Sequence, residues 1–178
     1  MNSDEPISGG PLTDFKATAP VTVGKRAEAS VTSVLRDLLT GAGHAVASLP
    51  SQDSRGEDAR FSIAGAPYTI QVTAIPQAPA FWNDVARGSA TTRVSLPQVA
   101  GWLDAAINDK LNATSKAERP RTIIALDAHD WADRVIAPDV VSKLNEQGLN
   151  PGQKHGLAGI AIVGRQSSNS TWLPGLLT

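Results

Sequence analysis

The chain has no cysteine, few aromatic residues and no long apolar run, and each absence excludes a class of protein. Without cysteine among its 178 residues, the chain cannot form disulfides or thiolate metal sites, which fits a reducing compartment. Aromatic residues make up 4% against 41% hydrophobic residues, so the core must consist of small and branched aliphatic side chains. No apolar stretch approaches the roughly 20 residues of a membrane span. We therefore expect a cytoplasmic protein with no membrane partner.

The chain also lacks an excess of either charge. Sixteen Lys and Arg residues face seventeen Asp and Glu residues, for a net charge of -1. A strongly basic chain would have indicated nucleic acid; this balance does not, although a local basic surface stays compatible with it. Residues 1–20 are acidic and rich in Gly, Pro, Ser and Thr, unlike a signal peptide. We expect them to form a disordered or loosely packed leader before a single domain over residues 21–178.

Hydrophobic periodicity predicts helices and strands in a defined order. Apolar residues three and four apart predict a helix within 22–44 that Gly41 and Gly43 end, a helix at 95–113, and a third, shorter helix at 138–150. Alternating residues predict strands at 44–50, 59–65 and 66–76, with a hairpin turn at 65–67. Dense apolar runs predict buried strands at 121–129 and 156–165. This order predicts an α/β sandwich with a mixed sheet, and "TWLPGLL" closes it as an edge strand or packed tail.

Four polar residues occupy suggestive places on these elements. Glu28 lies on the first helix, Asp58 opens the second strand, and Gln71 and Thr73 lie two positions apart on the third. Strand alternation puts Gln71 and Thr73 on one face, and the start of the neighbouring strand can bring Asp58 beside them. The first helix region also carries Gly24, paired apolar residues and a final glycine, and the second helix carries Gln98 and Trp102 four positions apart.

These residues and the element order resemble the restriction-endonuclease-like fold of the PD-(D/E)xK superfamily, over roughly residues 22 to 130. The resemblance implies a mixed central sheet flanked by helices, with an α-β-β-β-α-β core. It implies a divalent-metal-dependent nuclease-like domain acting on DNA, with Mg²⁺ as the cofactor. Glu28, Asp58 and Gln71 would be the metal ligands, and these three with Thr73 would form the catalytic site.

The chain departs from the superfamily pattern at its centre. Gln71 stands where the family has Asp or Glu, and it offers a carbonyl oxygen without charge. Thr73 stands where the family has lysine, so the ammonium that would stabilise the transition state is missing unless Lys25 or Arg26 supplies it. Two functions therefore stay open. One is a Mg²⁺-dependent phosphodiesterase, and the other is a catalytically dead nuclease-fold module that binds protein or nucleic acid in a larger assembly.

Plain structural roles also stay open for each of these residues. Gln71 and Thr73 fit the solvent-facing side of a strand, the acidic pair at 57–58 fits the end of a charged loop, and Glu28 fits a first-turn acid that favours the helix dipole. Asp127 and Asp130, after the strand at 121–129, suit either a metal or a capped turn. A third hypothesis is a small α/β domain with no nuclease ancestry, and DNA, a protein or a second copy of the chain are all possible partners.

Overall fold

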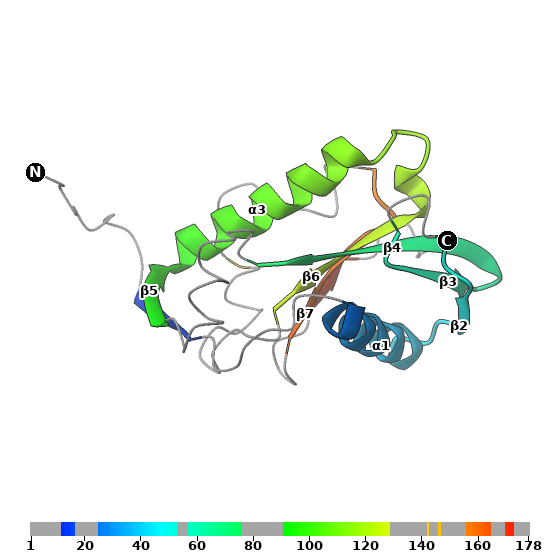
Figure 1. The fold of residues 1–178 in the computed structure, drawn as a ribbon, viewed down its shortest axis with the longest axis horizontal. Helices are drawn as coiled ribbons and strands as arrows, with labels where there is room; N and C mark the ends of the chain where they lie inside the picture. Colours follow the sequence, from blue (N-terminus) through cyan, green and yellow to red (C-terminus); the bar gives the residue numbers. More distant parts are fainter. Residues whose placement is uncertain are drawn as a thin grey trace, which may run out of the picture.

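Two α-helices cover opposite faces of a six-stranded mixed sheet in the computed structural model (Figure 1). The sheet has the strand order β2-β3-β4-β6-β7-β8, and β1 and β5 form a separate two-stranded sheet. This architecture confirms the predicted α/β class with a mixed sheet. The structure describes residues 12–16, 25–52, 57–75, 91–128, 142, 146, 156–164 and 170–172.

An antiparallel meander forms one half of the main sheet. It consists of β2 (Val46–Leu49), β3 (Ala59–Ile63) and β4 (Ala66–Ala74). The turn between β3 and β4 is Ala64-Gly65, where both residues have positive φ angles of 51° and 83°. Two such residues make the tight turn that matches the twist of a hairpin, and glycine favours it. The turn therefore lies one residue earlier than the predicted 65–67, and Pro67 is already part of β4.

Parallel strands form the other half of the sheet. The strands β6 (Thr122–Asp127) and β7 (Gly159–Val163) run parallel to β4, and β8 (Ser170–Trp172) pairs antiparallel with β7 at the edge. Every residue of β6 and β7 is buried, because helices cover both faces of this region. The prediction of buried strands from the two dense apolar runs is confirmed.

The helices α1 (Lys25–Gly41) and α3 (Leu96–Ala113) each bury one apolar stripe. In Figure 1 α3 lies above the sheet and α1 below it. The α1 stripe packs against Phe61, Ile70, Ile123 and Ala161, whereas the α3 stripe packs against Ile75, Ile124, Leu126 and Ile162. The two stripes are Val31, Leu35 and Leu39 on α1, and Val99, Leu103, Ala106, Ile107 and Leu111 on α3. None of the described helices is long and apolar enough to cross a membrane.

Two predicted segments differ from the structure. Residues inside the expected leader form β1 (Leu12–Lys16), which pairs antiparallel with β5 (Thr91–Ser95), where the sequence predicted no strand. Strand pairing between segments so distant in sequence supplies hydrogen bonds that local composition cannot indicate. The predicted helix at 138–150 lies mostly outside the described residues, although Ser142 and Glu146 are helical.

Candidate functional site

The strand β4 has two chemically different faces. Tyr68 and Ile70 join the core beneath α1, and Val72 packs against it. Thr69, Gln71 and Thr73 alternate with them and therefore point to the face that α3 covers. Gln71 is 9% exposed and Thr73 is 7% exposed, so neither residue is on the solvent-facing side of a strand. The sequence correctly grouped Gln71 and Thr73 on one face, and the structure places that face in the interior.

Asp58 lies beside Gln71, as the sequence predicted. Its backbone N–H donates to the carbonyl of Ile70 (3.0 Å), which extends the β3–β4 pairing by one residue and sets Asp58 opposite Gln71. Its carboxylate Oδ2 accepts the backbone N–H of Val72 at 2.6 Å. Beyond the start of β3 this N–H has no strand partner, and a half-buried donor needs one. Asp58 thus completes the β4 ladder where β3 begins, which is a structural role.

Glu57 is the more buried acid of the pair, with 7% exposure, and sequence reasoning did not select it. Its carboxylate accepts hydrogen bonds from the backbone N–H of Gln52 and from the hydroxyl of Thr69, the latter at 3.2 Å. Burial of a carboxylate requires such partners. Thr69 lies on β4, twelve residues further along the chain. Only the folded hairpin therefore places Glu57 with the polar residues Thr69 and Gln71 of β4.

Glu28 lies in the first turn of α1, and its backbone carbonyl accepts the hydroxyl of Thr32 at 2.9 Å. Because α1 packs on the face opposite to α3, the sheet separates α1 from the face that carries Gln71 and Thr73. The structure therefore brings Asp58 and Gln71 together and leaves Glu28 across the sheet from the polar pair. The side chains of Lys25 and Arg26, and Asp130 as a whole, lie outside the described residues.

The described oxygen atoms around Gln71 do not make up the ligand set that Mg²⁺ prefers. This ion requires hard oxygen ligands in near-octahedral geometry, usually including carboxylates. The carboxylate of Asp58 already accepts a backbone N–H, and Gln71 contributes no charge. Within the described ranges no three His, Cys, Asp or Glu side chains gather where a metal could be held. Asp127 is buried at the end of β6, where strand alternation directs it to the α1 face with Ile123 and Ala125.

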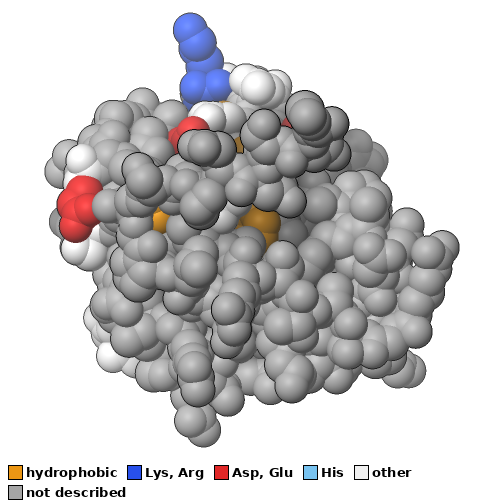
Figure 2. Space-filling model, turned by 90° about the vertical axis from the view of Figure 1, so that its left-hand side faces the viewer, with side chains coloured by type: hydrophobic (Ala, Val, Ile, Leu, Met, Phe, Trp, Pro, Cys, Tyr) orange, Lys and Arg blue, Asp and Glu red, His pale blue; other side chains and the backbone are white. Residues whose placement is uncertain are grey.

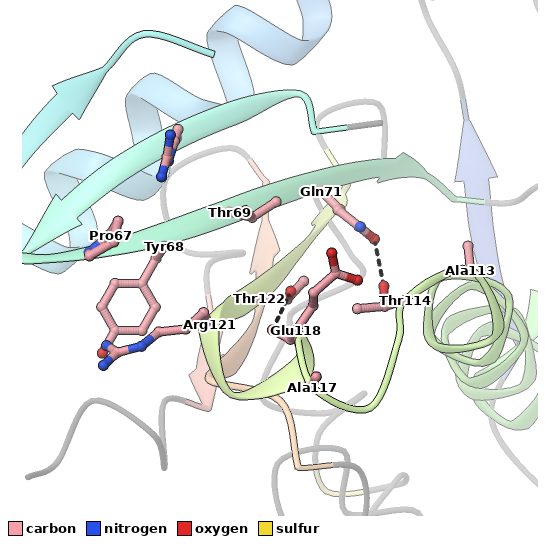
Figure 3. Close-up of a pocket in the computed structure, with 11 residues that line it drawn as sticks. Pro67, Tyr68, Thr69, Gln71, Ala113, Thr114, Ala117, Glu118, Arg121 and Thr122 are labelled. Atoms are coloured by element: carbon pink, nitrogen blue, oxygen red, sulfur yellow. Dashed lines mark hydrogen bonds between the residues drawn. The ribbon is translucent and has the colours of Figure 1, made fainter. Parts of the chain in front are cut away.

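A cavity of about 280 Å³ lies where α3 ends over β4. Figure 3 shows Gln71 and Thr114 pointing toward one another across it, with Glu118 nearby. The hydroxyl of Thr114 donates to the carbonyl of Lys110 at 2.8 Å and lies 3.4 Å from Gln71 Oε1, a second and longer acceptor for the same proton. The described lining comes from β3, β4, the end of α3, the turn with the short 3₁₀ helix η2 (Arg119–Arg121), and the start of β6. It consists of Arg60, Pro67, Tyr68, Thr69, Gln71, Ala113, Thr114, Ala117, Glu118, Arg121 and Thr122.

The charged groups among the described residues that line this cavity are two arginines and one glutamate. Arg121 stacks on the ring of Tyr68, with 5.0 Å between its guanidinium carbon and the ring centroid. Glu118 Oε2 accepts the hydroxyl and the backbone N–H of Ser115, at 2.6 and 3.3 Å. On the face drawn in Figure 2, the described Lys, Arg, Asp and Glu side chains are few and form no continuous basic patch.

Comparison with known proteins adds no relative from which a ligand or reaction could be transferred. No family model matches the chain, and neither a curated protein nor a solved structure matches it.

Proposed function

We propose that the chain is a restriction-endonuclease-like domain that does not cleave DNA and serves as a DNA-binding module in a larger assembly. The element order of the main sheet and its helices supports the kinship: α1, the meander β2-β3-β4, α3 and β6 come in the order helix, three strands, helix and strand, with β5 of the separate two-stranded sheet inserted before α3. The parallel pairing of β4 with β6 gives the mixed sheet that the resemblance implies. DNA is the partner expected from that resemblance.

The observation that carries the loss of cleavage is the burial of Gln71 and Thr73 beneath α3. These residues stand where the superfamily has a carboxylate and a lysine, and they are 9% and 7% exposed. A neutral amide and a hydroxyl cannot supply the negative charge that holds Mg²⁺ or the ammonium that stabilises a phosphoryl transition state. Of the described carboxylates nearby, Asp58 accepts the N–H of Val72, and Glu57 accepts the N–H of Gln52 and the hydroxyl of Thr69. The polar row of Thr69, Gln71 and Thr73 therefore favours a role in the fold and in binding over a role in hydrolysis.

A cleavage assay on supercoiled plasmid tests the loss of activity. The wild-type chain and Asp58→Ala are incubated with Mg²⁺ or Mn²⁺, with a chelator as the blank. We expect neither protein to nick the plasmid above the blank. Metal-dependent nicking by the wild type that disappears in Asp58→Ala would overturn the proposal and restore Asp58 as a metal ligand.

A binding assay tests the DNA part of the proposal. Fluorescence anisotropy of a labelled duplex is measured against protein concentration, at two salt concentrations and with a chelator present. We expect binding that weakens as salt rises, because contacts to phosphates release counterions. Absence of binding at the lower salt would contradict DNA as the partner.

A further inference from the structure

Gln71 lines the cavity under the end of α3, and its amide has few hydrogen bonds there to the described residues. The Thr114 hydroxyl has one proton and lies closer to the carbonyl of Lys110 (2.8 Å) than to Gln71 Oε1 (3.4 Å). The bond to Gln71 is therefore weak. Among the described residues nothing accepts a hydrogen bond from Gln71 Nε2. A side chain that is 9% exposed thus keeps a donor for a molecule in the cavity (Figure 3).

Two guanidinium groups line the same cavity. Arg60 pairs with Thr69 across the β3–β4 ladder, which places Arg60 on the face that carries Gln71. Arg121 approaches from the turn before β6, and its stacking on Tyr68 restricts its guanidinium. Neither arginine forms an ion pair with a carboxylate of the described residues. The cavity therefore has two cationic groups without described anionic partners.

The negative groups nearby are largely satisfied. The C-terminal end of a helix carries partial negative charge on its last carbonyl groups. The carbonyl of Lys110 accepts the Thr114 hydroxyl, and that of Leu111 accepts the guanidinium of Arg119 at 3.0 Å. The carboxylate of Glu118 is held by Ser115. Among the described lining residues two are arginines and one is a glutamate, and the buried carboxylate of Glu57 accepts a hydrogen bond from the lining residue Thr69.

We propose that this cavity binds a small molecule through an oxyanion, either a phosphate or a carboxylate. Arg60 and Arg121 pair with the anionic oxygens, and Gln71 Nε2 donates to the same molecule. Guanidinium groups suit both anions because their N–H groups match pairs of oxygens. At about 280 Å³ the cavity suits a small ligand. The inference rests on the cavity alone and holds whether or not the chain binds DNA.

Isothermal titration of the full chain tests this site. The probes are inorganic phosphate and succinate, each compared with sodium chloride at the same ionic strength. The variants are Arg60→Met, Arg121→Met and Gln71→Leu, and the matched control is Arg36→Met. Arg36 is an exposed arginine of α1, on the opposite side of the sheet, and pairs with Asp37 at 3.7 Å. Circular dichroism melts confirm that each variant is folded.

We expect saturable binding of at least one probe by the wild type and by Arg36→Met. Removal of either cavity arginine should weaken it about tenfold or more, as for a lost charge-assisted hydrogen bond, and Gln71→Leu should weaken it less. Preference for phosphate or for succinate identifies the anion. Binding of neither probe would overturn the proposal, and so would equal binding by Arg60→Met, Arg121→Met and Arg36→Met.

Discussion

The two faces of the central sheet are built differently, although the same strands form both. Beneath α1 the strands β6 and β7 contribute apolar side chains, and the one described polar side chain there is that of Asp127, at the end of β6. The apolar residues are Ile123, Ala125, Ala161 and Val163. Beneath α3 the strands β6 and β7 are equally apolar, but β4 contributes Thr69, Gln71 and Thr73. A buried polar row costs stability unless each group has a partner. The α1 face is therefore a core, whereas the α3 face along β4 combines a core with a polar site.

Placing a polar side chain on the apolar face of β4 should have the largest effect on the free energy of unfolding. Ile70→Gln puts an amide into the apolar core beneath α1, and we expect it to lower the free energy of unfolding by about 3–5 kcal/mol. Gln71→Leu, on the adjacent residue and the opposite face, should change it by less than about 1 kcal/mol, because no strong hydrogen bond is lost. Urea denaturation of both variants measures the difference. Equal losses would show that the faces do not differ in kind.

Truncation of the α1 stripe should come next. Leu35 is fully buried, so Leu35→Ala should cost about 2–5 kcal/mol through lost burial and the cavity left behind. The matched control is Leu38→Ala on the same helix, whose side chain is only half-buried and should cost clearly less. Both are measured by urea denaturation. If the two losses are the same, α1 does not pack by the stripe described.

Asp58→Ala should have an intermediate effect on stability. It leaves the N–H of Val72 without its acceptor, which should cost about 1–3 kcal/mol. Asp58→Asn keeps an acceptor oxygen and should recover part of the loss. Thermal melts with and without Mg²⁺ separate structure from metal binding, because a structural role predicts the same loss in both. Stabilisation of the wild type alone by Mg²⁺ would contradict this prediction.

The smallest effect should come from the hydroxyl that joins α3 to the polar row. Thr114→Val removes the bonds to Lys110 and Gln71, and we expect a loss of about 0.5–1.5 kcal/mol. The control is Thr32→Val on α1, whose hydroxyl bonds only to carbonyls of its own helix and should change stability by less than about 0.5 kcal/mol. Urea denaturation compares the two. A larger loss for Thr32→Val would reverse the comparison.

Much of the fold could be predicted from local patterns. Alternation identified β2, β3 and β4, and spacing of three and four residues identified α1 and α3, because side-chain direction follows the backbone repeat. Two elements were missed for a physical reason. The pairing of β1 with β5 joins residues near positions 12 and 95, and such a long-range partner leaves no signature in either short segment.

The candidate site was predictable only in part. The resemblance already grouped Asp58 with Gln71, but the register that sets them opposite one another comes from the turn at Ala64-Gly65 and not from the predicted turn at 65–67. The hydrogen bond from Thr69 to Glu57 depends on where the segment before β3 lies over the sheet. The cavity that Gln71 and Arg121 line depends on where α3 ends over it. No local pattern contains that information, because it arises from contacts between separate elements.

The sequence by itself determined which residues of each strand and helix share a face, since backbone geometry fixes that repeat for every chain. It determined that Gln71 and Thr73 lie together and that neither a carboxylate nor a lysine occupies their positions. Only the tertiary structure decided that α3 covers them and that α1 covers the opposite face. Periodicity defines the faces of a strand, but which helix packs on each face follows from how the connections cross the sheet.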